Sequence, residues 1–147
     1  MTDLTDFAKV AADDHNLCVV SSARADGTIQ ASLVNAGVMH HPLRDVDAAV
    51  LVAMGGSKKL ANWRARPEIT VVARASWNWV AVEGRAELIG PDDPAPDVDA
   101  ERLRLLLREA FVAAGGTHDD WDEYDRVMAR DRRTVVFVVP ARVYSNG

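Results

Sequence analysis

The sequence predicts a mainly β, α+β protein in which about six mostly antiparallel strands form a closed or half-closed barrel with helices at its edges. Three observations support this expectation. Strand-like segments outnumber helical ones, several are joined by tight turns, and few helices stand between consecutive strands. The chain has 147 residues, enough for one good core, and we expect a single domain over 1–147.

The first half is expected to begin with a helix and continue with a hairpin. Apolar side chains recur at helical spacing over residues 3–14. Two apolar segments, Leu17–Arg24 and Thr28–Met39, flank a tight turn and predict paired strands. A loop that contains Pro42 leads to a third strand over about 46–54.

Two more strands are expected after a short helix that stops before Pro67. They cover Glu68–Ala75 and Trp77–Ile89. The second of them alternates between apolar and polar residues, so its two faces have different environments. The side expected in the core holds Val80, Val82, Ala86 and Leu88, and the other side holds Trp77, Trp79, Glu83, Arg85 and Glu87.

The last third predicts two helices and a strand. After the stiff acidic loop 90–96, Asp99 is a candidate cap for a helix that ends at a Gly-Gly pair. Thr117 with Asp120 resembles a capping box at the start of a second helix. The continuously apolar run Thr134–Val139 predicts a central strand covered on both sides.

Composition excludes several classes of function. Seventeen Lys and Arg against 22 Asp and Glu give a net charge of −5, which disfavours nonspecific nucleic-acid binding. The single cysteine, Cys18, cannot form an internal disulfide and suits a reducing compartment. The chain shows no stretch long enough to span a membrane and no signal peptide, so we expect a cytoplasmic protein.

The most informative segment lies between the third strand and the helix before Pro67. Its double glycine lets the backbone approach a ligand closely, Ser57 suits the N-cap, and two lysines add positive charge. Asn62 can share a helix face with those lysines. The candidate phosphate cradle consists of Met54, Gly55, Gly56, Ser57, Lys58, Lys59 and Asn62.

A solvated loop before a helix is the alternative explanation of the same residues. The spacing fits neither the Walker A loop nor the Gly-x-Gly-x-x-Gly of dinucleotide-binding folds. Spacing alone therefore leaves both interpretations open.

Two further features are consistent with a planar ligand. Trp77 and Trp79 lie on the side of their strand away from the core, which predicts a subunit interface, a platform for a flat ring, or both. Asn35 and Gly37 interrupt an apolar strand face and suit a flat ligand against the backbone. A bulge or a barrel corner is the alternative explanation of both residues.

Other clusters carry weaker signals. No metal site is expected, because His40-His41 has no further ligand at suitable spacing. His118-Asp119-Asp120 is a possible carboxylate site or simply a capped helix start. Residues 130–133 suggest a solvated helix end from which an arginine could reach an anionic tail. No catalytic side chain presents itself, which suits chemistry carried by a cofactor.

Four stretches together resemble a known family. They are Gly55–Pro67 (GGSKKLANWRARP), Trp77–Gly84 (WNWVAVEG), His118–Tyr124 (HDDWDEY) and the terminal Arg142-Val143-Tyr144. In this order they are similar to the actinobacterial flavin/deazaflavin oxidoreductases, which have the split barrel of pyridoxamine 5′-phosphate oxidase. The resemblance runs from about Leu17 to Tyr144. It is strongest to the subgroup that uses the deazaflavin coenzyme F420.

The resemblance implies a homodimer with two cofactor grooves at the subunit interface. It implies hydride transfer between reduced F420 and an electron-poor, planar small molecule. Ser57, Lys58, Lys59 and Asn62 would lie near the cofactor phosphate, the two tryptophans near the cofactor, and the strand around Asn35 beside its ring. Some relatives carry an arginine at the position of Ser57, so phosphate binding here depends more on the lysines.

Three alternatives remain open at this point. The same barrel could hold FMN, because both cofactors carry a phosphate. It could be a non-catalytic protein that carries or sequesters F420. A haem-binding barrel would need His40, His41 or His118 as an axial ligand.

Overall fold

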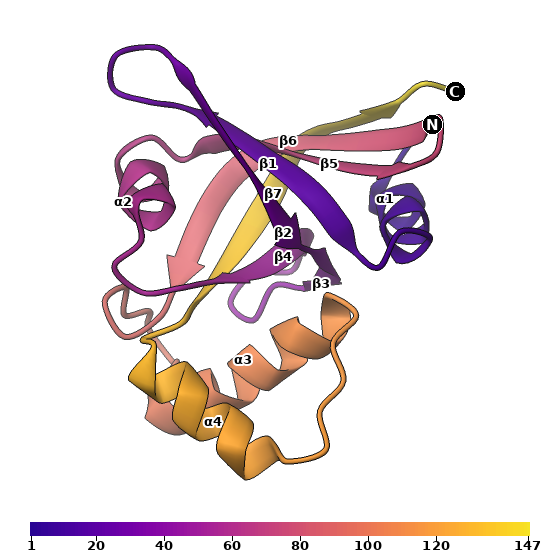
Figure 1. The fold of residues 1–147 in the computed structure, drawn as a ribbon. Helices are drawn as coiled ribbons and strands as arrows, with labels where there is room; N and C mark the ends of the chain where they lie inside the picture. The colour runs from indigo at the N-terminus through magenta and orange to yellow at the C-terminus, as the bar shows by residue number, and fades with distance from the viewer.

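The computed structural model describes all residues from Met1 to Gly147 (Figure 1). Its elements in chain order are α1 (Leu4–Ala12), β1 (Leu17–Ala23), β2 (Ile29–Asn35), β3 (Gly37–His40), β4 (Asp47–Ala53), α2 (Lys58–Ala65), β5 (Glu68–Ala75), β6 (Asn78–Ile89), α3 (Ala100–Ala113), α4 (Trp121–Arg130) and β7 (Thr134–Ser145). The strands form one sheet in the order β2-β1-β5-β6-β7-β4-β3, and every neighbouring pair is antiparallel. The predicted mainly β, antiparallel fold is confirmed.

The structure has seven strands because the segment expected as one strand over Thr28–Met39 is two. β2 pairs with β1, whereas β3 pairs with β4. These two strands are the opposite edges of the sheet, so the chain passes from one edge to the other through the single residue Ala36. The sheet must therefore curl upon itself. An apolar pattern contains no signal for a change of partner strand, and for that reason the prediction of one long strand was wrong.

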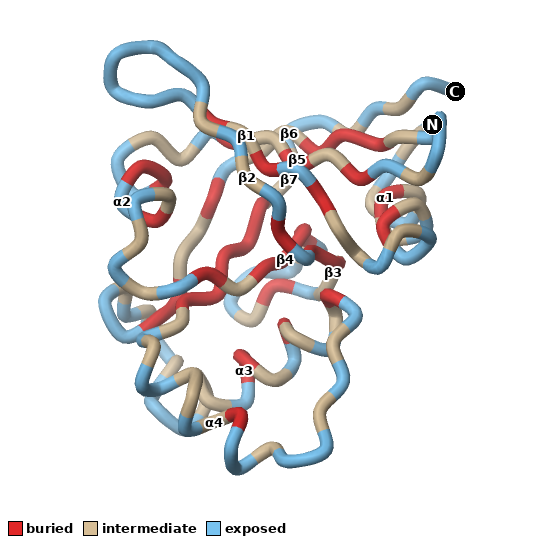
Figure 2. The backbone as a smooth tube through the Cα atoms, in the orientation of Figure 1, coloured by how far each residue is buried: buried red, intermediate tan, exposed pale blue.

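Two hydrophobic cores lie on the two sides of β7, as the buried segments in Figure 2 illustrate. Val136 and Val138 belong to the larger core of 19 buried residues, which fills the barrel and includes Phe7 of α1 and Trp63 of α2. The alternate residues of β7, among them Phe137, belong to a smaller core of nine buried residues beneath α3 and α4. The prediction of a central strand covered on both faces is confirmed.

Helices α3 and α4 form a pair that packs against β3, β4 and β7 (Figure 1). Asp99 caps α3 as predicted, by accepting a hydrogen bond from the backbone N–H of Arg102 at 2.8 Å. The cap of α4 is Asp120 itself, which accepts from the N–H of Glu123, so the predicted box with Thr117 as the cap was wrong. Asp120 precedes the first helical residue directly, and Thr117 lies too far from the first turn. No helix has the length and apolar character needed to cross a membrane.

Candidate functional site

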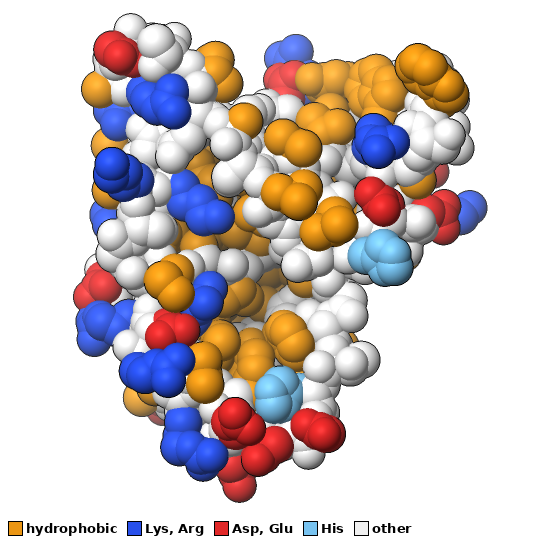
Figure 3. Space-filling model, in the orientation of Figure 1, with side chains coloured by type: hydrophobic (Ala, Val, Ile, Leu, Met, Phe, Trp, Pro, Cys, Tyr) orange, Lys and Arg blue, Asp and Glu red, His pale blue; other side chains and the backbone are white.

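A cavity of about 520 Å³ lies between the β2 edge of the barrel and the α3–α4 pair. Its walls come from β2, Val52 of β4, Lys59 of α2, the end of α3 with the following loop, α4, and Arg133 just before β7. Figure 3 shows the hollow, with hydrophobic side chains on both walls, Lys and Arg at the side of α2, and Asp and Glu over α4. The size lies within the range of small-molecule sites.

One end of the cavity is positively charged, and Lys59 has no acidic partner there. Burial and, next, the nearby charge of Arg133 lower the pKa of the Lys59 ammonium. Arg133 has a buried Nε atom with no hydrogen-bond partner, and its Nη2 is 3.5 Å from Asp131 Oδ2. Two cations that repel each other beside an unsatisfied N–H form a site that an anion would stabilise.

The neighbouring arginines are, in contrast, already neutralised. Arg64 makes two hydrogen bonds of 2.7 Å to the carboxylate of Asp93, and Arg132 pairs with Asp92. No ion pair involves Lys58 or Lys59. The unpaired charge at this end of the cavity therefore comes from Lys59. Lys58 is exposed on the same helical turn outside the cavity lining, and Arg133 shares its charge with Asp131.

The start of α2 adds backbone N–H groups to these cations. Ser57 is the N-cap, as predicted, and its Oγ accepts from the N–H of Leu60 at 3.4 Å. The first residues of an α-helix have no intrahelical acceptor for their N–H groups, so those of Lys58 and Lys59 stay available. Gly56 has φ +74°, with open space where a Cβ would lie. A ligand can thus approach the backbone at this turn.

Gly55 has a different role from Gly56. A Cβ at Gly55 would lie 2.3 Å from the carbonyl oxygen of Arg132, and its N–H donates to the carbonyl of Asp131. This glycine fixes the turn against the end of α4. Met54, beside it, is 46% exposed at the surface.

Asn62 does not face the lysines. Its side-chain N–H groups donate to Ser22 Oγ at 3.1 Å and to the carbonyl of Ala23 at 2.9 Å, and its Oδ1 accepts two bonds from Arg66. All its hydrogen-bonding capacity is used inside the protein. The prediction that Asn62 shares the lysine face is therefore wrong, and its amide instead ties α2 to β1.

Of the two residues predicted beside a flat ligand, Asn35 faces the cavity and Gly37 does not. Asn35 lines the cavity, its side-chain N–H donates to the carbonyl of His15 at 2.9 Å, and its Oδ1 has no partner. A Cβ at Gly37 would lie 1.8 Å from the carbonyl oxygen of Ala113. Helix α3 occupies the space predicted for a flat ligand, so Gly37 is corrected to a corner glycine required by packing.

Trp77 and Trp79 lie at the other end of the β5–β6 hairpin from α2 (Figure 1). β5 alone spans eight residues, or about 25 Å, between them. Trp77 is 87% exposed in the turn, and Trp79 packs edge-on against Tyr144 with 6.0 Å between ring centroids. Within one chain these tryptophans do not share a site with the lysines.

The far end of the cavity carries aromatic residues that sequence reasoning did not assign to a site. Phe111 and Tyr124 have ring centroids 4.9 Å apart, and His118 is 5.7 Å from Tyr124. In the sequence, His118 and Tyr124 stood out only within the stretch His118–Tyr124, and Phe111 carried no signal of a site. Of the other histidines, His41 is buried, with Nε2 3.0 Å from Glu87 and Nδ1 accepting from Leu43 N–H. No cluster of His, Cys, Asp and Glu with the form of a metal site occurs.

The fold and this cavity can be set beside known proteins. Residues 4–145 match the family model described as pyridoxamine 5′-phosphate oxidase. The chain belongs to this family. The pyridoxamine 5′-phosphate oxidase family includes oxidoreductases, and the match spans both the cradle and the cavity.

Solved structures share the fold of this family member at low sequence identity. A conserved hypothetical protein of Mycobacterium tuberculosis has a TM-score of 0.70 and 17% identity, over 99% of this chain and 84% of that one. An F420 reductase has a TM-score of 0.63 and 13% identity, over 98% of both chains. A pyridoxamine 5′-phosphate oxidase-related, FMN-binding protein of Nostoc punctiforme gives 0.65 and 11%, over 94% and 80%.

Proposed function

We propose that this chain is an F420-dependent oxidoreductase that transfers a hydride between reduced coenzyme F420 and an electron-poor, planar, conjugated small molecule. The observation that carries the proposal is the end of the cavity where Lys59, which has no acidic partner, lies beside Arg133 and the start of α2. This chemistry fits a phosphate. The likeness to an F420 reductase of the same length supports the choice of cofactor.

The residues of the chain have distinct tasks in this proposal. Lys58, Lys59 and the N–H groups of the first turn of α2 hold the phosphate, and Arg133 adds charge beside Lys59. Asn35 offers its free Oδ1 to a ring N–H beside β2. When bound, F420 supplies the hydride chemistry, so the protein needs to bind, orient and exclude water.

We further propose that the active form is a homodimer. A row of neighbouring residues crosses five strands on the outer face of the sheet: Leu33, Val19, Val72, Ala81 and Tyr144. Leu33 is 63% and Val19 45% exposed, although both are apolar. Leu33 also lines the cavity, so in the proposed dimer the second copy would lie next to the cavity mouth. That copy can supply Trp77 and Trp79, which are remote within one chain.

The experiment that tests the function is a parallel titration of the purified protein with F420 and with FMN. Expression in a host that lacks F420 gives colourless protein if F420 is the ligand, whereas tightly held FMN gives yellow protein. We expect F420 to bind more tightly. Tighter binding of FMN transfers the proposal to an FMN-dependent oxidase or reductase, which the FMN-binding structural relative supports. Binding of neither molecule refutes both.

Turnover separates an enzyme from a carrier. Reduced F420 with a panel of enones and quinones should be oxidised in the presence of the protein. Tight binding without any oxidation would identify a carrier protein. Haem titration covers the remaining alternative, because axial ligation produces a Soret band.

The dimer has its own test. Leu33→Glu places a charge at the β2 end of the apolar row and should convert a dimer into a monomer in analytical ultracentrifugation. Arg85→Glu is the matched control, because Arg85 is an exposed strand residue outside that row. A monomeric wild-type protein would rule out the interface.

A further inference from the structure

The end of the cavity opposite the cations carries aromatic side chains together with two polar ones, His118 and Glu123. Phe111, Trp121 and Tyr124 surround His118, with centroid distances to the imidazole of 6.4, 5.9 and 5.7 Å. Tyr124 cannot serve as a donor to a ligand, because its hydroxyl donates to the carbonyl of Leu107 at 2.8 Å. Burial raises the pKa of that hydroxyl to about 12. Because the carboxylate of Glu123 can only accept, His118 is the side-chain hydrogen-bond donor left for a ligand at this end.

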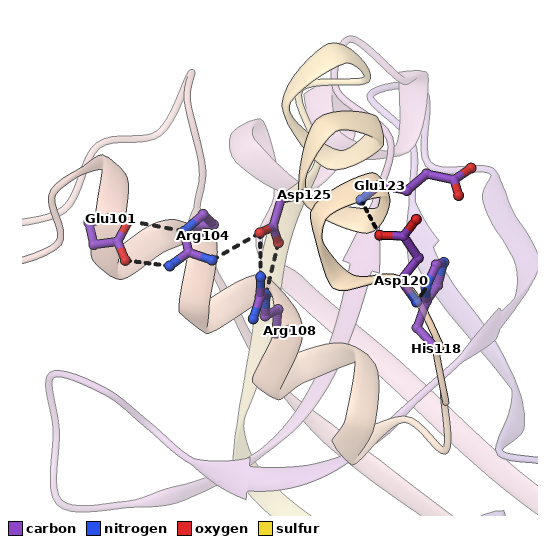
Figure 4. Close-up of polar contacts among 7 residues, drawn as sticks. All are labelled: Glu101, Arg104, Arg108, His118, Asp120, Glu123 and Asp125. Carbon is purple, nitrogen blue, oxygen red and sulfur yellow. Dashed lines mark hydrogen bonds and ion pairs between the residues drawn. The ribbon is translucent and has the colours of Figure 1, made fainter.

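The backbone fixes the tautomer of His118. The N–H of Asp120 donates to His118 Nδ1 at 3.0 Å, as drawn in Figure 4. A nitrogen that accepts this bond carries no proton, so the neutral imidazole holds its proton on Nε2. Nε2 has no hydrogen-bond partner in the protein, and the side chain is 28% exposed where it lines the cavity.

The helix that follows the loop of His118, α4, is tied to α3. Asp125 accepts hydrogen bonds from Arg104 at 2.9 Å and from Arg108 at 2.9 Å, which links α4 to α3 (Figure 4). Asp120 caps the same helix and simultaneously anchors His118 through its N–H. A donor on such a support is preorganised toward the cavity.

We propose that His118 donates a hydrogen bond from Nε2–H to the acceptor oxygen of the substrate, and that the substrate is a neutral, planar, conjugated carbonyl compound. This inference rests on the proposed function. The aromatic walls suit a flat ring, and the exposed carboxylates of Glu123 and Asp119 disfavour an anionic substrate at this end.

The chemical step balances without a proton from His118. The hydride adds with its electron pair to the β-carbon of the substrate, and the π pair of the C=C bond shifts toward the carbonyl oxygen. The resulting enolate oxygen is stabilised by Nε2–H. A solvent proton then adds to the α-carbon of an enone or, for a quinone, to the enolate oxygen, and enolisation of the other carbonyl gives the hydroquinone. His118 keeps its proton throughout, since a proton on Nδ1 would break the bond from Asp120.

Two substitutions distinguish the proposed donor role of His118 Nε2 from the structural role of its Nδ1, which accepts the Asp120 N–H. His118→Asn keeps an acceptor for the Asp120 N–H, because an Asn Oδ1 readily bonds the N–H two residues on, but it has no group at the Nε2 position. His118→Gln places an amide N–H near that position. Thermal melting of both variants checks that the fold is intact.

The probes are menadione, a neutral planar quinone, and 2-methylnaphthalene, which has the same ring system without oxygen. Binding is measured calorimetrically with and without oxidised F420. We expect His118→Asn to lower the affinity for menadione about 3- to 10-fold, which is the range for the loss of one neutral hydrogen bond. The affinity for 2-methylnaphthalene should not change, and His118→Gln should recover most of the loss.

Turnover supplies the second readout. Charge on the oxygen develops only as the hydride arrives, so kcat for menadione should fall more in His118→Asn than its affinity does. Unchanged affinity and kcat for menadione in that variant would overturn the proposal. A loss of affinity for 2-methylnaphthalene as large as the loss for menadione would also overturn it. If wild-type protein fails to bind F420, the proposed function fails, whereas the comparison of the two probes without cofactor still tests His118.

Discussion

Replacing Lys59 by methionine should stabilise the free protein and weaken its binding of a phosphate-bearing cofactor. The ammonium of Lys59 is half-buried, faces Arg133 and lacks an acidic partner, so its pKa is lowered by burial first and by that arginine second. Methionine keeps the aliphatic stem and removes the charge. A stability gain coupled to a functional loss is typical of residues that are poised for a ligand.

The magnitudes follow from these contacts. Removing a poorly solvated, repelled charge should add about 0.5–1 kcal/mol to the free energy of unfolding. For a chain of 147 residues this raises Tm by about 1–4 °C. Loss of a charge-assisted hydrogen bond to phosphate costs about 1.5–3 kcal/mol of binding free energy, which lowers the affinity for the cofactor about 10- to 150-fold.

The assay combines scanning calorimetry of the free protein with a fluorescence titration of F420. Lys58→Met is the matched control, because Lys58 belongs to the same helical turn but is exposed. It should leave Tm unchanged and reduce affinity less, since water and salt screen an exposed charge. A lower Tm together with unchanged F420 affinity in Lys59→Met would show that the lysine is structural and that the reasoning is wrong.

Three other predictions test the fold around the site. Gly37→Ala places a Cβ 1.8 Å from the carbonyl oxygen of Ala113 and should lower the free energy of unfolding, measured by urea denaturation, by about 3 kcal/mol. A decrease smaller than about 1 kcal/mol would contradict this close packing. Asp125→Asn should cost about 1–3 kcal/mol at pH 7. Because Arg108 holds the pKa of the Asp125 carboxyl below its usual value, that stabilisation is complete above about pH 4 and is lost as the pH falls through the folded-state value. The wild type and the variant should therefore converge in strongly acidic buffer, and a constant difference would exclude the ion pair as its cause. Burial raises the pKa of the Cys18 thiol to about 12, so a disulfide reagent should modify it only after unfolding, and rapid labelling of the native protein would disprove its burial.

The elements could be predicted closely because their signals are local. Asp99 and Ser57 are caps in the sequence and in the structure, since a cap needs only its own side chain and the next turn. The apolar run of β7 announced a strand buried on both faces. The break at Ala36 could not be foreseen, because the partner of each half lies elsewhere in the chain.

The candidate site divides in the same manner. The lysines and the N-terminus of α2 are contiguous in sequence, so the pattern alone located a positively charged turn. Asn62 satisfies the same spacing rule, yet its amide is used by Ser22, Ala23 and Arg66. Spacing along a helix defines which residues are neighbours on its surface, but packing against the sheet decides which of those surfaces remains accessible.

By itself, the sequence determined the strand-rich architecture, the capped helix after the double glycine and the placement of two cations at its start. Only the tertiary structure decided that Arg133 would face Lys59, that α3 would fill the space above Gly37, and that His118 would stand among aromatic rings at the other end of one cavity. The physical reason is the distance along the chain over which each interaction acts. Periodicity, capping and turn chemistry act over a few residues, whereas the surroundings of a side chain depend on segments brought together by the curl of the sheet.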